Sequence, residues 1–436
     1  MSALMAGIVG IAAFLALMAL RVPIAVGMAV VGFFGFSYVV SPEAALRVVA
    51  KDFYSVFSSY SLSVIPMFAW MGYLAFYAGI GSQLFSFAYK LLGRLPGGLA
   101  IATQAACAVF GAVCGSSTAT AATIGAISLP EMKKYRYDPS LATASVASGG
   151  AIGIMIPPSV IFVVYGIATE QSIGRLFIAG ITPGVVLTLA YIIAILAVTA
   201  RNPSLGPPAP PEKVKEIPVT LAGGVLDIFL IFVISLGGLF AGLFTPTEAG
   251  AVGTACVFLV SLARGRINRD VIARSLSDTT RTTAMIMFLI AGATIFGRFI
   301  AVTRIPFELA NWAGSLPLPP FVVLGIVLMI YLILGCFIDA LAMILLTVPI
   351  FYPVVVETLG YDPIWFGVMI VMVVAIGVIT PPVGMNVYVI KGVAKDVPLE
   401  TIFRGVWPFL IAAVVCCVLF TAFPGIVTFL PDLLMP

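Results

Sequence analysis

Long apolar segments recur along the whole chain, and short stretches between them hold most of its charges. Most of these segments approach the roughly 20 residues that a transmembrane helix needs. The expected spans are 4–20, 23–40, 62–80, an interrupted 140–169 and 176–200, then 222–243, 246–262, 282–301, an interrupted 363–393 and 402–423. The pattern therefore predicts an all-α polytopic membrane protein, with an amphipathic stretch at 81–96 between two of the spans.

Two pairs of apolar segments are too short to be spans. The legs 97–113 and 118–130 surround Gly115-Ser116-Ser117-Thr118, and the legs 319–334 and 340–356 surround Gly335-Cys336-Phe337-Ile338-Asp339. Because each pair meets at small or polar residues, we expect two re-entrant helical hairpins, at 97–131 and 319–356. The alternative is that each pair forms two full spans joined by a polar loop.

The two parts of the chain resemble each other at a separation of about 220 residues. Tyr137-Asp138-Pro139 matches Tyr361-Asp362-Pro363, and each motif is followed, twenty residues after its tyrosine, by a proline pair. Further matches are Gly115 with Gly335 and Pro23 with Pro246. We therefore expect two repeats, 1–200 and 222–436, joined by a Pro-rich cytoplasmic linker at 201–221.

Five spans in each repeat would leave the second repeat inverted relative to the first. The basic residues test this arrangement independently. With 81–96 in the cytoplasm, 17 of the 22 lysines and arginines fall on the cytoplasmic side, as the positive-inside rule requires. The first hairpin is then expected to enter from the cytoplasm and the second from the opposite face.

Composition supports a membrane protein and removes several functions. The chain is 61% hydrophobic and 9% charged, against about 25% charged residues in a typical soluble domain. The absence of histidine excludes histidine metal sites and Ser–His catalysis. The six cysteines lie in apolar segments without metal-ligand spacing, so we interpret them as packing residues. No basic residue precedes Arg21, so no cleaved signal peptide is expected.

The proline pairs and the first hairpin tip are the main candidates for chemistry. Pro157-Pro158 and Pro381-Pro382 should break their helices and free backbone carbonyls, which transporters use to bind ions, although both could be structural kinks. The run from Gly115 to Thr120 is rich in hydroxyls, which suit a monovalent cation such as sodium. Its alternative role is close helix packing.

Carboxylates in apolar surroundings form a second group of candidates. Asp339 at the second tip is a functional candidate by position, a helix N-cap, or both. Asp227 and Glu248 are also in apolar context, and we expect Glu248 to cap the start of a span. No arginine is expected at mid-membrane, and Arg298 comes nearest, toward the outer end of its span. Asn386 could bind an ion or the substrate.

Several motifs resemble the large membrane subunit of the tripartite ATP-independent periplasmic (TRAP) transporters, the DctM-like family. The resemblance covers essentially the whole chain, and its most specific parts are the 115–120 run, Met155–Ser159, Tyr361–Pro363 and Thr380–Asn386. It implies a sodium-driven importer of carboxylates or related organic acids in the bacterial inner membrane. It also implies an elevator motion of hairpins and broken helices past a fixed scaffold.

The resemblance also implies sites and partners. It places one sodium site at Ser116, Ser117, Gly153 and Ile156, and another at Gly335, Asp339, Thr380 and Met385. The residues expected near the substrate are Thr118, Pro157, Pro158, Ser159, Pro381, Pro382 and Asn386. The implied partners are a small four-span DctQ-like membrane subunit, expected as a separate chain, and a soluble DctP-like periplasmic binding protein. No organic cofactor and no nucleic acid are expected.

Three other functions compete with this one. A sodium–dicarboxylate symporter of similar architecture would work without a binding protein, and composition cannot separate it from the first interpretation. A membrane enzyme would need a nucleophile–base pair or a metal site, which isolated carboxylates do not supply. A channel fits two hairpins from opposite faces less well than alternating access does.

Overall fold

The computed structural model describes residues 2–208 and 222–435, and every regular element within them is helical. The predicted all-α class is therefore confirmed. Most of the predicted linker lies outside the described residues, and its described beginning is the end of α10 and a short turn, Pro203–Leu205. Among the described residues, five helices are long and apolar enough to cross a membrane, or six if the bent pair α4 (Val64–Tyr77) and α5 (Ile80–Leu92) counts as one span. Several other expected spans are shorter apolar helices, so the count of ten spans stays a prediction.

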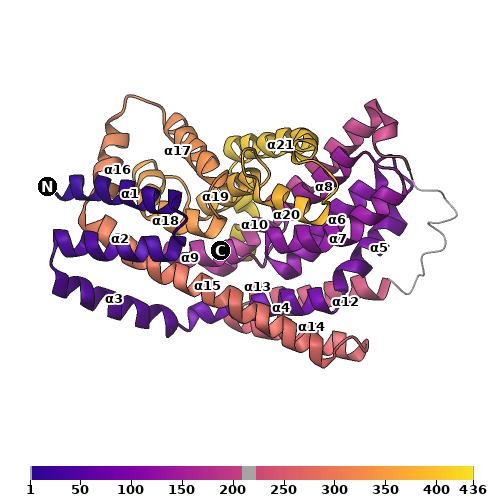
Figure 1. The fold of residues 1–436 in the computed structure, drawn as a ribbon, viewed down its shortest axis with the longest axis horizontal. Coiled ribbons are helices and arrows are strands. Elements are labelled where there is room, and N and C mark those ends of the chain that lie inside the picture. Colours follow the sequence, from indigo (N-terminus) through magenta and orange to yellow (C-terminus); the bar gives the residue numbers. More distant parts are fainter. Residues whose placement is uncertain (1, 209–221, 436) are drawn as a thin grey trace.

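One layer of the molecule is built from helices of both halves (Figure 1). Its members are α1 (Ala3–Ala19), α2 (Ile24–Val39), α3 (Pro42–Phe57), α4 (Val64–Tyr77), α12 (Ala222–Phe232), α13 (Gly238–Phe240), α14 (Pro246–Ala263) and α15 (Arg269–Val302). The long helix α15 packs against α2, α3 and α4. Glycines allow this close contact, because a Cβ on Gly32 would lie 2.8 Å from the Phe296 backbone. We call this layer the scaffold.

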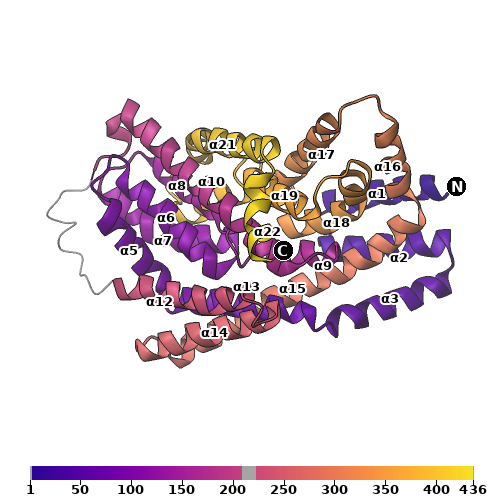
Figure 2. The ribbon, with the colours of Figure 1, turned by 180° about the vertical axis from the view of Figure 1, so that it is seen from behind.

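The second layer contains the hairpins and the broken helices (Figure 2). The first half supplies α6 (Gly98–Cys114), α7 (Ser117–Lys134), α8 (Pro139–Ile152), α9 (Val160–Ala168) and α10 (Ile173–Arg201). The second half supplies α17 (Pro320–Gly335), α18 (Ala340–Tyr352), α19 (Pro363–Gly377), α20 (Met385–Val393) and α21 (Leu399–Ala422). The halves interlock here, since α20 packs on α7 and α8 while α9 packs on α18 and α19.

The repeated Tyr-Asp-Pro motif starts the two broken helices. Asp138 accepts a hydrogen bond from the Ser140 amide at 2.9 Å, and Asp362 accepts one from the Trp365 amide at 2.7 Å. In each case the following proline occupies the first helical turn, where its missing N–H costs nothing. The sequence match therefore reflects the same N-terminal capping in α8 and α19.

Three helices were not expected, and one is longer than expected. The additional helices are α3, α16 (Ile305–Ser315) and the C-terminal α22 (Gly425–Leu434). Helix α15 begins at Arg269, well before the predicted start at residue 282. Its first turns are polar, so hydropathy misses them, but Asn268 caps the helix and Arg274 pairs with Asp270 at 2.9 Å. The amphipathic stretch is α5 (Ile80–Leu92), bent by 65° from α4.

Candidate functional site

The first hairpin turns at a position that only glycine can occupy. Gly115 has a φ of +62°, and a Cβ there would collide with the carbonyl oxygen of Pro158. Ser116 follows as the N-cap of α7, and its hydroxyl accepts a hydrogen bond from the Ala119 amide at 3.4 Å. The tip is thus held directly against the first helix break.

A buried asparagine fastens the same tip to the second half of the chain. The Ser117 hydroxyl donates to the Asn386 carbonyl oxygen at 2.9 Å, and the Asn386 amide donates to the Ala147 carbonyl at 2.8 Å. Asn386 is fully buried at the start of α20. It therefore joins α7, α8 and α20 and lies behind the tip.

Glycine contacts place both hairpins on their broken helices in the same way. In the first half, a Cβ on Gly111 would lie 2.5 Å from the Cα of Gly153, where α8 ends. In the second half, a Cβ on Gly377, at the end of α19, would lie 2.8 Å from the carbonyl carbon of Gly335. By packing, the counterpart of Gly335 is thus Gly111, one turn before the Gly115 that sequence matching had paired with it.

The second hairpin turns at a capping aspartate. Asp339 accepts hydrogen bonds from the amides of Leu341 and Ala342, at 3.0 and 3.5 Å, and so starts α18. The predicted N-cap role is confirmed. Asp339 also faces a cavity, so capping does not account for the whole of its surroundings.

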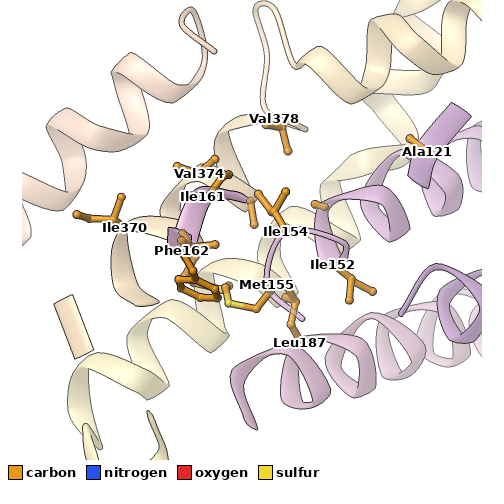
Figure 3. Close-up of a cluster of buried hydrophobic side chains, with 14 of the residues drawn as sticks. Ala121, Ile152, Ile154, Met155, Ile161, Phe162, Leu187, Ile370, Val374 and Val378 are labelled. Carbon is orange, nitrogen blue, oxygen red and sulfur yellow. The ribbon is translucent and has the colours of Figure 1, made fainter. Parts of the chain in front are cut away.

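The two tips and the two breaks meet around a cavity of about 210 Å³. The hairpins and breaks supply Gly115, Ser116, Ser117, Thr118, Ile154, Val160, Ile161, Asp339, Ala340, Leu341, Val378 and Met385, and the scaffold supplies Tyr73, Thr282, Met285 and Ile286. Figure 3 shows Ile154 and Val378, one from each break, among the buried apolar side chains around this region. Asp339 is the one charged residue in this lining.

Four helices begin at the cavity. Ser117 of α7, Val160 of α9, Ala340 of α18 and Met385 of α20 are first residues of their helices, and all four line it. A helix N-terminus carries a partial positive charge and unpaired amides, so it favours anions. The geometry therefore makes this cavity suitable for a small anion without a buried arginine.

The structure brings some of the predicted site residues to the cavity and leaves others behind it. Ser116, Ser117, Thr118, Asp339 and Met385 line the cavity. Those outside the lining are Gly153, Ile156, Pro157, Pro158, Ser159, Gly335, Thr380, Pro381, Pro382 and Asn386. The first proline pair is buried, whereas the second is exposed.

Three of the residues outside the lining have structural contacts of their own. The Thr380 hydroxyl donates to the Ile376 carbonyl at 2.6 Å, as in an ordinary helical turn. Ile156 packs against Gly184 of α10, where a Cβ would come within 2.5 Å of it. Gly153 lies against Gly111 and Thr120. These contacts fill the space around each residue.

Two buried hydroxyls near the first break lack a hydrogen bond of ordinary geometry among the described residues. They are the Thr120 and Ser159 hydroxyls, both fully buried, and the Cys114 thiol lies beside the Thr120 hydroxyl. A Cβ on Gly153 would lie 2.7 Å from the Thr120 hydroxyl oxygen, so the two residues are neighbours. Because an unpaired buried hydroxyl is costly, these oxygens are candidates for an ion or a water ligand. Thr120 was in the predicted hydroxyl run but was not chosen as a site residue.

The scaffold side of the cavity was missed altogether. Tyr73 of α4 and Thr282 of α15 line it, and their hydroxyls lie 2.8 Å apart. They are 209 positions apart in the chain, and neither belongs to a motif. Only the packing of α4 on α15 brings them together, so no local sequence signal could have identified them.

The other two carboxylates singled out for their apolar context, Glu248 and Asp227, have structural partners. Glu248 forms a capping box with Thr245 at the start of α14, which confirms the predicted cap. Asp227 accepts two hydrogen bonds from Arg264, both at 3.1 Å. These two carboxylates are therefore accounted for without a ligand.

An exposed ion pair lies at the end of the first hairpin that is farthest from its tip. Lys133, near the end of α7, lies 2.6 Å from Asp396, in the loop that follows α20. The hydrogen bond from Lys133 holds the pKa of the Asp396 carboxyl below its usual range. Since both side chains are largely exposed, the pair contributes little to stability.

Comparisons with known proteins agree over nearly the whole chain. A family model described as "Tripartite ATP-independent periplasmic transporter, DctM component" matches residues 11–426. A Pseudomonas aeruginosa relative, "C4-dicarboxylate TRAP transporter large permease protein DctM", is 37% identical, covering 90% of this chain and 91% of its own. "Isethionate TRAP transporter permease protein DctMQ" of Oleidesulfovibrio alaskensis is 33% identical, covering 92% of this chain and 62% of its own.

A solved structure has a similar fold. It is titled "Crystal structure of the Alcanivorax borkumensis YdaH transporter reveals an unusual topology". The TM-score is 0.62 at 15% sequence identity, over 88% of this chain and 89% of the other. At this identity the likeness concerns the fold alone.

Proposed function

Because the chain belongs to the DctM component family of the tripartite ATP-independent periplasmic transporters, we propose that it imports small organic acids by sodium-coupled transport. As a large permease it is a multi-pass membrane protein of a transport system, not an enzyme. The relatives are named for C4-dicarboxylate and isethionate, both small organic anions. We propose the same chemical class, carboxylates or related acids, as its substrates.

The observation that carries this proposal is the cavity at which four helix N-termini meet. A carboxylate placed there would face backbone amides and the hydroxyls of Ser116 and Thr118. The rest of the lining is mostly apolar, which suits the carbon skeleton of a small acid.

Sodium is the proposed coupling ion, at one site beside each hairpin tip. At the first tip, we add the buried hydroxyls of Thr120 and Ser159 to Ser116 and Ser117 as proposed sodium ligands. At the second tip, the capping hydrogen bonds from Leu341 and Ala342 both go to one carboxylate oxygen of Asp339, and its other oxygen is the proposed sodium ligand. Hard oxygen ligands of this kind fit a sodium ion.

The two-layer arrangement supports an elevator mechanism. The proposed sites lie between the hairpins and the breaks, and the scaffold contributes four residues to the cavity lining. In the proposed motion, the second layer carries ions and substrate past the scaffold. Helices α5 and α16 link the layers in the chain order and would act as its arms.

The proposed partners are a small membrane subunit and a periplasmic binding protein that delivers the acid. The family is one component of a tripartite system. This favours a transporter that depends on a binding protein over the alternative, a sodium–dicarboxylate symporter that works without one. The location would be the bacterial inner membrane. One relative is a permease named DctMQ and is longer than this chain, consistent with a fused second subunit.

The test is uptake into proteoliposomes that contain the large and small membrane subunits, with the binding protein added outside. We expect accumulation of the acid that the binding protein carries only when sodium is higher outside than inside. Full-rate uptake in sodium-free buffer, driven by a pH step, would contradict sodium coupling. Uptake that is equally fast without the binding protein would favour the alternative.

A further inference from the structure

A buried amide from the second half of the chain holds the tip of the first hairpin. Asn386, the second residue of α20, is fully buried and lies outside the cavity lining. Its carbonyl oxygen accepts the Ser117 hydroxyl of α7 at 2.9 Å, and its amide nitrogen donates to the Ala147 carbonyl of α8 at 2.8 Å. Ser117 itself lines the cavity. Asn386 therefore lies one hydrogen bond behind a cavity residue.

The Ala147 carbonyl decides the direction of both hydrogen bonds. A carbonyl can only accept, so the amide nitrogen of Asn386 faces Ala147 and its carbonyl oxygen faces Ser117. The Ser117 proton is thereby committed to Asn386. A hydroxyl has one proton and two lone pairs, so both lone pairs of Ser117 remain on the side away from Asn386. This is the orientation that a hydroxyl needs in order to bind a cation in the cavity.

Close packing around Asn386 keeps this orientation fixed. Helix α20 packs on both α7 and α8. On α8, a Cβ at Gly150 would lie 2.9 Å from the Asn386 amide nitrogen and 2.9 Å from the Ser117 carbonyl oxygen. A glycine is thus what lets the three helices come this close. The amide has little room to turn, so its two hydrogen bonds hold the Ser117 hydroxyl in one direction.

The broken-helix architecture does not itself require an amide at this position. Asn386 lies five positions after the first proline of its break, and the residue at the same distance in the first break is Phe162. Phe162 is also fully buried, and Figure 3 shows it among apolar side chains. A buried amide is costly unless its donors and acceptors are paired, and these two bonds use only half of its capacity. Packing alone therefore does not account for Asn386.

Resting on the sodium site proposed at the first tip, we infer that Asn386 is a positioning residue for that site. It turns the lone pairs of the Ser117 hydroxyl toward the sodium ion and does not touch the ion itself. A residue that hydrogen-bonds to an ion ligand orients it in this way and raises the affinity for the ion. The first sodium site is then complete only when α20, from the second half of the chain, is packed against the first hairpin.

The experiment measures sodium binding to the purified complex of the large and small membrane subunits. An apparent dissociation constant is fitted to the rise in melting temperature with sodium chloride, and choline chloride keeps the ionic strength constant. The variants are Asn386→Leu, the smaller Asn386→Ala, Ser117→Ala, and the double variant of Ser117→Ala with whichever Asn386 substitution folds. The matched control is Gln104→Leu, because Gln104 is a fully buried amide that also donates to an α8 carbonyl, that of Ser145 at 2.7 Å.

Both Asn386 variants should raise the apparent dissociation constant for sodium roughly two- to tenfold, as for loss of one neutral hydrogen bond. The double variant should bind sodium no more weakly than Ser117→Ala alone, because Asn386 acts through the hydroxyl that this substitution removes. A residue that only stabilised the fold would instead give losses that add. Gln104→Leu should lower the sodium-free melting temperature and leave the dissociation constant for sodium within about twofold.

Four results would overturn the inference and leave the proposed sodium coupling intact. They are unchanged sodium binding in a folded Asn386 variant, additive losses in the double variant, an equal loss in Gln104→Leu, and Asn386 variants that both fail to fold while Gln104→Leu folds. The last result would give Asn386 a structural role only. A folded wild type that sodium does not stabilise would contradict the proposed sodium coupling itself, and the inference would fall with it.

Discussion

Substitution of Asp339 separates the two roles that the structure gives this residue. One carboxylate oxygen accepts the amides of Leu341 and Ala342, and the side chain faces the cavity. Asp339→Asn keeps an acceptor oxygen for the cap and removes the charge, and asparagine caps helices about as well as aspartate. Asp339→Ala removes both the cap and the charge.

The expected magnitudes differ for the two variants. Loss of the cap in Asp339→Ala should lower the free energy of unfolding by about 1 kcal/mol, whereas Asp339→Asn should unfold nearly like the wild type. If the carboxylate binds sodium, both variants should weaken that binding by about 1–3 kcal/mol, a roughly five- to 150-fold rise in the sodium concentration needed.

The assay is a sodium titration of binding-protein-dependent uptake in proteoliposomes, with melting temperature as the folding control. With two distinct sodium sites, the Hill coefficient for sodium should also fall in Asp339→Asn. Ser117→Ala at the other tip should have a smaller effect, because backbone carbonyls there remain. Normal sodium dependence with intact transport in Asp339→Asn would refute this reasoning and leave Asp339 as a helix cap only.

Three further predictions concern packing, the buried hydroxyls and topology. Gly377→Ala places a Cβ 2.8 Å from the Gly335 backbone and should cost about 1–3 kcal/mol, whereas Gly325→Ala has nothing within 4 Å and should not destabilise; equal melting temperatures would contradict this. Thr120→Val should weaken sodium dependence with little change in stability. The control Thr103→Val loses a 2.8 Å hydrogen bond, so it should lose about 0.5–1.5 kcal/mol of stability without a change in sodium dependence. The reverse pattern would show that Thr120 is not part of the sodium site. Thr358→Cys in a cysteine-free background should react with impermeant thiol reagents from the periplasm, and labelling only from the cytoplasm would refute the inverted repeats.

The sequence predicted the turns between the paired helices because their signals are local. Each pair of apolar legs meets at a residue that ends or starts a helix, such as Gly115 or Asp339. Glu248 was correctly assigned to a cap for the same reason, since a capping box needs only three residues of spacing. Signals that involve residues only a few positions apart, such as caps and turns, can be recognised in the sequence without knowledge of tertiary contacts. That both pairs are re-entrant stays a prediction, because the helical segment Ala340–Thr358 is long and apolar enough to cross a membrane.

What escaped prediction depends on contacts between distant segments. Tyr73 and Thr282 reach the cavity only because α4 packs on α15. The two proline pairs look equivalent in sequence, yet the pair at 157–158 is buried and the pair at 381–382 is exposed. Repeat matching aligned Gly115 with Gly335, although packing makes Gly111 the counterpart. In each case the burial and the neighbours of a residue depend on which element packs over it, and residue spacing along the chain does not reveal that element.

The low charge of the cavity offers a physical reason for coupling under the proposed mechanism. An empty site would carry the Asp339 carboxylate through the membrane without a balancing cation in the lining. Moving such an uncompensated charge away from water costs several kcal/mol. Bound sodium would cancel this charge, and a second ion would offset the carboxylate held by the helix N-termini. The loaded site could then cross far more readily than the site with substrate alone, so sodium and substrate would move together.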